Sequence, residues 1–480
     1  MASSAAAARD DVPARPRPGP ASKLAAQVAD QIVGDVMAMG WPVGELLGSE
    51  ANLLARYRVS RAVFREAVRL VEHQQVARTR RGPGGGLVIT EPTVDAVIGA
   101  VVLYLYRVEA RLDELLEARL VLEEIVTDLA PGRLEEADLT RMRSFLSGGD
   151  PDLATDSRAL HALLASLTRN PVLELFVDVL SRVAMLYSTD WQSPGPAAGG
   201  ETAHAHARIA EALIAGDSGL ARRRMRKHLE AEGELLRRRR SARDLLPGDV
   251  VVLGEFSNGK RAEAVARRIT LRIVGDRIPP GELVGTEKEL IEQEGVSRAV
   301  LREAVRLLEH HQTARMRRGP GGGLIASEPS ASAVTEVAAI YLARRGVSRS
   351  DLAELRTGVE VELVGLAAAR IDAPGTACIR AAIEREPAVP GEEQDEAAGD
   401  LHAAVAGAAR NRVLELVALV LIRLSALHRV ERLAPGAREP TRAEVLRTHE
   451  RIAAAVESGD RELARDRMRA HLDELATFMR

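Results

Sequence analysis

Apolar residues recur at intervals of three and four over most of the chain, which is the spacing of one face of an α-helix. The pattern predicts amphipathic helices at Leu24–Met37, Ala262–Ile273, Leu112–Leu129 and Val172–Leu186. Short apolar runs beside glycine clusters, such as Leu87–Thr90, instead predict small β-strands. Helix-favouring residues dominate the composition, and aromatic residues make up only 2% of it. We therefore predict a mainly α chain that contains small β-hairpins.

One long segment of the sequence occurs twice. Val59–His73 recurs with two changes as Val296–His310, and Arg80–Leu87 recurs unchanged as Arg317–Leu324. The distance between the copies far exceeds the roughly 20–50 residues of a solenoid repeat. We therefore predict two complete copies of a two-domain unit, fused in tandem.

Each copy begins with a helix, a Pro/Gly turn and two further helices. Ser60 and Ser297 are predicted to cap the third helix, because a serine side chain can accept a bond from the first free backbone N–H groups. On that helix, arginines at i, i+4 and i+8 form a stripe opposite Val63, Ala67 and Leu70. Such a stripe suits the major groove of DNA, where an arginine can bond one guanine twice. The stripe residues are Arg61, Arg65 and Arg69 in the first copy and Arg298, Arg302 and Arg306 in the second.

A glycine-rich tip between two short strands follows the third helix and predicts a wing. Its glycines allow the backbone to approach the sugar-phosphate groove, and the flanking arginines can reach phosphates. A phosphate-binding nucleotide loop would need Gly-Lys-Ser/Thr and a following helix, and the sequence has neither. The wing candidates are Arg80, Arg81 and Gly85 in the first copy and Arg317, Arg318 and Gly322 in the second.

The distribution of charge agrees with DNA binding better than the total does. The whole chain has a formal net charge of -3, but 22–90 carries nine Lys/Arg against six Asp/Glu and 259–327 carries thirteen against nine. These excesses of +3 and +4 are modest, so they support the assignment only together with the helix and the wing.

The Val-Ser-Arg-x-x-x-Arg-Glu-Ala helix, the preceding Pro-x-Gly turn and the Gly-Gly-Gly wing resemble the GntR family of bacterial transcription factors. The resemblance implies winged helix-turn-helix domains in which Arg61 and Arg65, and likewise Arg298 and Arg302, read bases. The family often has another basic residue in the second helix, and that position holds Ala51 in the first copy and Lys288 in the second. The two modules are therefore expected to differ in DNA affinity.

The predicted organisation follows from the repeat and the resemblance. Its boundaries are 1–21 for a disordered arm, 22–91 for DNA-binding module 1, 92–240 for helical domain 1, 241–257 for a linker, 258–328 for DNA-binding module 2 and 329–480 for helical domain 2. Within the linker, Val250–Leu253 is either a short strand or packed coil.

Three histidines recur at matched positions in the two helical segments: His161, His206 and His228 in the first and His402, His449 and His471 in the second. This arrangement resembles the ligand-binding (FCD) domain of the FadR-like subgroup, an antiparallel helical bundle that often holds a divalent metal. The subgroup's usual aspartate ligand would stand one turn before the first histidine, where this chain has Ser157 and Ala398. The histidines either bind Zn²⁺ or Ni²⁺ without that ligand or line a pocket.

Arg119 and Glu123, with their counterparts Arg356 and Glu360, stand four residues apart on predicted helices. This spacing allows an ordinary surface ion pair. The resemblance implies instead that Arg119 and Arg356 face the cavity and bind an acidic effector.

The remaining features restrict the class of protein. No apolar run is long enough to cross a membrane, no signal-peptide core is present at the N-terminus, and the single cysteine, Cys378, is interpreted as a small core residue. We expect a cytoplasmic regulator, not an enzyme, that binds double-stranded DNA and a small carboxylate or acyl effector, and that acts as a repressor. The fused copies are expected to form an intramolecular pseudo-dimer, with pairing of whole chains left open. The alternative is a histidine-rich metal-binding or ligand-binding scaffold, or a hydrolase, with vestigial DNA modules.

Overall fold

The computed structural model describes residues 20–479, except for 81, 83, 148–156, 187–195, 240–260, 311, 312, 318, 320, 387–393 and 430–440. Most of the predicted arm and the whole predicted linker, including Val250–Leu253, lie outside the described residues. The first helix begins at Pro20, within the predicted arm. The chain divides into two compact units, residues 1–92 and 93–480, and each is described by itself.

The first unit contains module 1, a small helical bundle with a three-stranded sheet. Its elements are α1 (Pro20–Ala38), β1 (Leu46–Gly48), α2 (Glu50–Tyr57), α3 (Arg61–His73), β2 (Ala77–Arg80) and β3 (Gly86–Ile89). The strands are antiparallel in the order β1-β3-β2, so β1 adds a third strand that the hydrophobic pattern did not indicate. The strand has only three residues, which is too short a run to show an alternating pattern.

The third helix of module 1 docks through a face slightly different from the predicted one. Phe64, Ala67 and Val71 are buried, whereas Val63 and Leu70 are only partly covered. Positions 64, 67 and 71 follow the i, i+3, i+7 spacing of a helix that packs on α1. The buried face of α3 is therefore shifted by one residue from the predicted face, and the arginine stripe is exposed.

The second unit repeats this fold once as module 2. Its elements are α13 (Arg261–Gly275), β4 (Leu283–Gly285), α14 (Glu287–Glu294), α15 (Arg298–His310), β5 (Ala314–Arg317) and β6 (Gly323–Ala326). The strand order β4-β6-β5 matches that of module 1 element by element.

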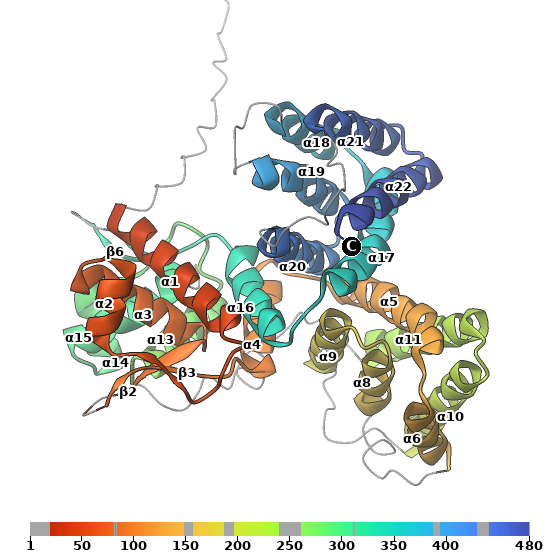
Figure 1. The fold of residues 1–480 in the computed structure, drawn as a ribbon, viewed down its shortest axis with the longest axis horizontal. Helices are drawn as coiled ribbons and strands as arrows, with labels where there is room; N and C mark the ends of the chain where they lie inside the picture. The colour runs from red at the N-terminus through yellow and green to blue at the C-terminus, as the bar shows by residue number, and fades with distance from the viewer. Residues whose placement is uncertain are drawn as a thin grey trace, which may run out of the picture. The chain divides into compact units, whose positions relative to one another are not determined.

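The rest of the second unit consists of two helical domains (Figure 1). Helical domain 1 contains α4 (Val94–Arg107), α5 (Leu112–Leu129), a 3-10 turn η1 (Ala130–Arg133), α6 (Glu136–Leu146), α8 (Ser157–Leu167), α9 (Pro171–Leu186), α10 (Pro196–Ile214) and α11 (Ser218–Arg239). Helical domain 2 contains α16 (Ala331–Arg344), α17 (Arg349–Arg370), α18 (Ala373–Arg385), α19 (Gln394–Ala408), α20 (Arg412–Arg429), α21 (Arg442–Glu457) and α22 (Arg461–Met479). The prediction of a mainly α chain with two small β elements is confirmed, although each β element is a three-stranded sheet.

The two helical domains contact each other reciprocally through α5 and α17, which lie side by side in Figure 1. Arg370 of domain 2 makes a two-point ion pair with Glu117 of domain 1 at 2.7 and 3.0 Å, and Arg133 of domain 1 pairs with Glu354 of domain 2. The two ion pairs are equivalent, because Arg370 occupies in the second copy the position of Arg133 in the first, and Glu354 occupies that of Glu117. Such reciprocity is the signature of a two-fold interface, here formed within one chain.

The α4 helix of domain 1 also holds module 2. The partly buried Arg107 side chain donates a hydrogen bond of 3.0 Å to the carbonyl oxygen of Thr313 and another to that of Ser327. Tyr106 donates from its hydroxyl group to the Val274 carbonyl oxygen at 3.3 Å. The helix α4 of the first copy therefore contacts module 2, which belongs to the second copy.

Candidate functional site

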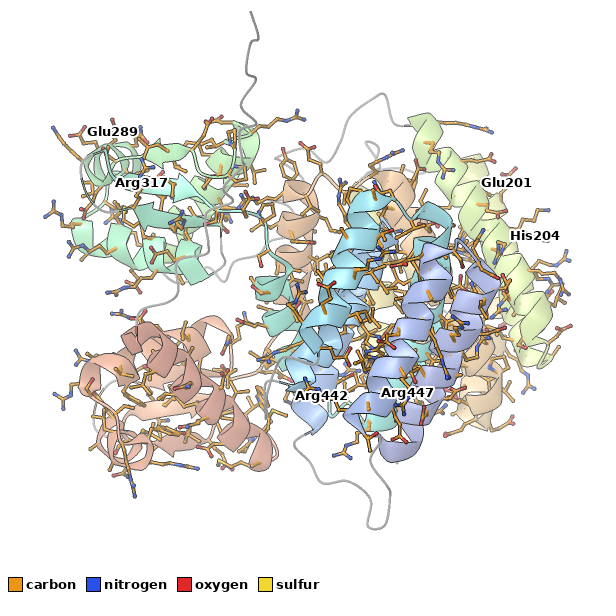
Figure 2. All side chains as sticks on the ribbon, turned by 90° about the horizontal axis from the view of Figure 1, so that it is seen from above. Glu201, His204, Glu289, Arg317, Arg442 and Arg447 are labelled. Carbon is orange, nitrogen blue, oxygen red and sulfur yellow. The ribbon has the colours of Figure 1, made fainter. Side chains whose placement is uncertain are left out.

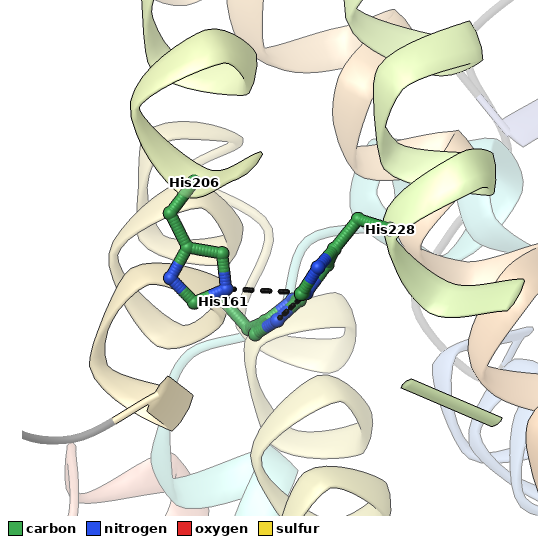
Figure 3. A group of neighbouring side chains, drawn as sticks. All are labelled: His161, His206 and His228. Carbon is green, nitrogen blue, oxygen red and sulfur yellow. Dashed lines mark hydrogen bonds between the residues drawn. The ribbon is translucent and has the colours of Figure 1, made fainter. Parts of the chain in front are cut away.

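Three buried histidines meet inside helical domain 1, each from a different helix (Figure 3). His161 lies on α8, His206 on α10 and His228 on α11. The Nε2 atom of His228 lies 3.1 Å from that of His206 and 3.2 Å from that of His161. The three matched positions of the sequence are therefore one cluster in space.

A carboxylate fixes the orientation of the first ring. Glu123 of α5 contacts Nδ1 of His161, and both side chains are only 3% exposed. Because the ionised carboxylate accepts the Nδ1 proton, Nε2 of His161 carries a lone pair that is directed at the other two rings. Arg119 donates in turn to Glu123 at 3.1 Å and to Glu232 of α11 at 2.9 Å.

Helical domain 2 repeats the cluster with His402 on α19, His449 on α21 and His471 on α22. Glu360 contacts Nδ1 of His402, and Nε2 of His449 lies 3.2 Å from that of His471. A second carboxylate, Glu386 at the end of α18, lies 2.8 Å from Nδ1 of His449. Its position in the sequence gave no signal, because the helix that carries it is more than sixty residues away from His449.

Burial keeps several of these imidazoles neutral. Loss of hydration lowers the pKa of His206 to about 2 and that of His228 to about 4, and neighbouring histidines lower both further. The same causes lower the pKa of His471 to about 2. Burial by itself would raise the pKa of Glu232, but Arg119 and His161 outweigh it and lower the pKa to about 2. His206 and His228 thus offer neutral nitrogens beside the ionised carboxylate of Glu232.

The donor set fits a divalent transition metal. An ion that binds imidazole nitrogens at about 2.0–2.1 Å holds two of them roughly 3.0–3.4 Å apart, which is the spacing seen here. Carboxylates behind metal-binding histidines are the usual orienting partners of such sites. The side chains of Ser157 and Ala398, which occupy the family's aspartate position, lie outside the described residues.

The interpretation of Arg119 and Glu123 as a surface pair is wrong. Arg119 is 3% exposed and Arg356 is 4% exposed, and each is paired with a carboxylate one turn along its helix. Both arginines border the histidine clusters. Glu117, two residues before Arg119, pairs with Arg370 of the other helical domain.

In the DNA-binding modules the arginine stripes are exposed, and an acidic residue lies beside each. Glu50 Oε1 lies 3.2 Å from Arg61 Nε and 3.7 Å from Arg65 Nε. Glu287 lies 3.2 and 3.5 Å from the corresponding Nε atoms in module 2, those of Arg298 and Arg302. The four arginine side chains are 64–68% exposed. The carboxylates hold each pair of arginines together on the outer face of the helix.

The third arginine of each stripe and the basic residue of the second helix are exposed as well. Arg69 pairs with Glu66 at 3.1 Å, and Arg306 is also exposed. Lys288 is 87% exposed. Ser60 and Ser297 cap the third helices as predicted, since their hydroxyl oxygens accept from Val63 N at 3.3 Å and Val300 N at 3.4 Å.

The wing tips need glycine for steric reasons. A side chain at Gly85 would place Cβ 2.3 Å from the Arg80 carbonyl oxygen, and Gly322 makes the same turn, with its N–H 2.8 Å from Gly319 O. Arg80 and Arg317 fold back and donate to wing carbonyl groups at 3.0 and 2.9 Å. Figure 2 shows Arg317 on the wing of module 2. Arg81 and Arg318 lie outside the described residues.

Two other residues are placed by the structure. His204 projects outward from α10, away from the cluster that contains His206 (Figure 2). Cys378 is exposed, so its interpretation as a core residue is wrong. None of the helices within the described residues has an apolar stretch long enough to cross a membrane.

Both kinds of domain match models of known protein families. A model of the FCD domain matches residues 114–231 and 351–474, together half of the chain, and a model of the bacterial regulatory proteins of the gntR family matches residues 261–322. The chain belongs to the gntR family and carries FCD domains. It is therefore a DNA-binding transcription regulator with a small-molecule-binding domain present twice. Module 1 has no family match of its own and is placed by its identical order of elements.

No curated protein matches the chain significantly. Solved structures similar to it include a Streptococcus agalactiae GntR protein, 21% identical, which covers 45% of this chain and 99% of that one with a TM-score of 0.32. A GntR-family regulator from Pseudomonas syringae pv. tomato, also 21% identical, covers 45% of this chain and 83% of that one with a TM-score of 0.23. The assignment rests on the family models and not on these two structures.

Proposed function

We propose that this GntR-family chain is a repressor in which each module reads one DNA half-site and the helical domains bind a metal ion and a small carboxylate or acyl effector. The observation that carries the proposal is the presence of two matching sets: an exposed arginine pair with a wing, and a buried histidine cluster with an arginine, each occurring once per copy.

The DNA-binding part of the proposal assigns base reading to Arg61 and Arg65 in module 1 and to Arg298 and Arg302 in module 2. Their guanidinium groups emerge from the first turns of α3 and α15, where a recognition helix meets base edges. The wing arginines add phosphate contacts, which are salt-dependent and independent of sequence. Because the two modules are tethered, binding of one raises the effective concentration of the other at a neighbouring half-site.

Selection of bound DNA from a random pool, followed by gel shifts, tests this part. We expect two similar half-sites, and we expect Arg61→Ala/Arg65→Ala and Arg298→Ala/Arg302→Ala each to abolish specific recognition of one of them. The matched control is Arg447→Ala/Arg451→Ala, which removes two exposed arginines at the same spacing from α21. Recognition of both half-sites by either variant would refute the assignment for the module that it changes.

The effector part assigns Arg119 and Arg356 to the edge of the ligand cavity. A planar guanidinium group can bind a carboxylate at two points, and burial strengthens such a contact. Repression by this chain is expected to be relieved by the effector, so a reporter under its own promoter should be more active in a deletion strain. Reporter activity that falls in the deletion strain would identify an activator instead.

The metal part is tested by elemental analysis of the purified protein. We expect two divalent ions per chain, held by His161, His206 and His228 in helical domain 1 and by His402, His449 and His471 in helical domain 2. The variants His206→Ala and His449→Ala should each lose one ion. The same metal content in both variants and the parent would refute the histidine sites.

A further inference from the structure

We propose that Glu232 is the carboxylate ligand of the metal in helical domain 1, and that helical domain 2 has no counterpart, so the two metal centres of one chain differ in ligand set and affinity. The inference rests on the metal-binding part of the proposed function. It concerns which side chains complete each centre beyond the three histidines.

Glu232 stands one helical turn after His228 on α11, so both side chains project to the same side of that helix. Its Oε2 atom lies 4.0 Å from His228 Nε2. A single ion with bonds of about 2.0–2.2 Å joins donors that are roughly 3 Å apart when adjacent and roughly 4 Å apart when opposite. The carboxylate oxygen is therefore within bridging distance of one donor, His228. Glu232 is not among the donors that all lie within 4.8 Å of one another, so its side chain has to turn toward the cluster to bind the same ion.

The two oxygens of Glu232 have different surroundings. Oε1 accepts from Arg119 at 2.9 Å, whereas Oε2 is buried and has no hydrogen-bond partner among the described residues. A buried carboxylate oxygen without a donor is costly, and a cation bound between Oε2 and the histidine nitrogens would satisfy it. The free oxygen is the one on the side of His228.

The balance of charge also favours a cation in domain 1. Arg119 is the only guanidinium group bonded to Glu123 and Glu232 within the described residues, so one arginine offsets two carboxylates. The first centre therefore has one negative charge in excess, close to three nitrogen ligands. The family's aspartate position on α8 holds Ser157, and Glu232 supplies the missing carboxylate from a different helix.

Helical domain 2 has a different arrangement. The position one turn after His471 holds Leu475, a partly buried apolar residue that packs on the core. The second carboxylate of this domain, Glu386, contacts Nδ1 of His449, on the opposite side of the ring from Nε2. It can orient that ring, but it is not directed at the ion. The second centre thus has three nitrogens and no protein oxygen in the place of Glu232.

The difference suggests a division of roles between the two domains. A centre with four protein ligands leaves fewer positions for an outside ligand than a centre with three. Arg119 already has two carboxylate partners, while Arg356 has, among the residues that the structure describes, the single carboxylate partner Glu360 at 2.6 Å. The open position and the less neutralised arginine both lie in helical domain 2, which is therefore the domain that would bind an effector carboxylate.

Metal titration of single-centre chains tests the inference. The His449→Ala background leaves centre 1 and the His206→Ala background leaves centre 2. Each full-length variant is titrated with Zn²⁺ against a chromophoric chelator. We expect centre 1 to bind at least about 10-fold more tightly than centre 2, and Glu232→Gln to weaken centre 1 by about 10–100-fold. The glutamine keeps an oxygen for Arg119, so the change removes only the charged ligand.

Two further variants complete the design. Glu234→Gln removes an exposed carboxylate from the same helix and should leave centre 1 unchanged. Leu475→Glu should strengthen centre 2 and, with Co²⁺ as the probe, should give it an absorption spectrum closer to that of centre 1. Unchanged affinity of centre 1 in Glu232→Gln would overturn the ligand assignment, and unchanged affinity of centre 2 in Leu475→Glu would overturn the explanation of the difference. Absence of any ion in the parent chain would instead refute the proposed metal function itself.

Discussion

Asn170 joins the two helical domains by a contact whose strength can be predicted from its hydrogen bonds. The side chain is fully buried. Its Oδ1 atom accepts from Val172 N at 3.1 Å and Leu173 N at 3.2 Å, which caps α9, and its Nδ2 atom donates to the Asp351 carbonyl oxygen of the other domain at 2.9 Å. Asn411 caps α20 in the same way and donates to the Glu114 carbonyl oxygen at 2.9 Å.

We expect Asn170→Ala to destabilise the pair of helical domains by about 1.5–2.5 kcal/mol. Loss of the cap contributes about 1 kcal/mol. Loss of the part-buried hydrogen bond to the Asp351 carbonyl oxygen contributes about 0.5–1.5 kcal/mol. At about 2–4 °C per kcal/mol for a domain of this size, the melting temperature should fall by roughly 3–10 °C. Differential scanning calorimetry of the full chain measures this shift.

Two variants separate the cap from the contact between domains. Asn170→Ser keeps an oxygen for the cap but is too short to reach Asp351, so it should recover only about 1 kcal/mol of the loss. Asp372→Ala removes a cap that accepts from Gly375 N at 3.0 Å within one domain, and it should lower the melting temperature by about 2–4 °C. If Asn170→Ala lowers it no more than Asp372→Ala does, the contact between the domains contributes nothing and the reasoning is refuted.

Two further predictions concern module 1. Glu50→Gln removes the carboxylate that competes with DNA for Arg61 and Arg65. Because two exposed ion pairs are lost, DNA binding measured by fluorescence anisotropy should tighten about 2–10-fold. Unchanged affinity would contradict the competition. Gly86→Ala would place Cβ 2.2 Å from the Gly48 carbonyl oxygen at a φ of 157°, so it should disrupt the pairing of β1 with β3. Hydrogen exchange of the strand amides should then be faster in the variant than in the parent. Equal protection of these amides in both proteins would show that the strands adjust.

Much of the fold follows from local patterns in the sequence. The 3.6-residue periodicity fixes the helices, and Ser60, followed by the arginine stripe, fixes where α3 begins and which face stays exposed. Strand β1 is missed because its pairing partner, β3, lies about forty residues away, and three residues show no periodicity of their own. The buried face of α3 is displaced by one residue for a similar reason, since packing on α1 decides which apolar residues are covered.

The sequence predicts some residues of the candidate site, and the tertiary structure adds others. The repeat by itself determined that three histidines and one arginine occur in matched positions in each copy, because duplication preserves residue types along the chain. Only the tertiary structure decided that Glu123 faces His161 and that Glu386 supports His449. Each of these carboxylates comes from a different helix than the histidine that it contacts. Their contacts depend on how the helices pack, and packing is set by long-range burial that no local pattern encodes.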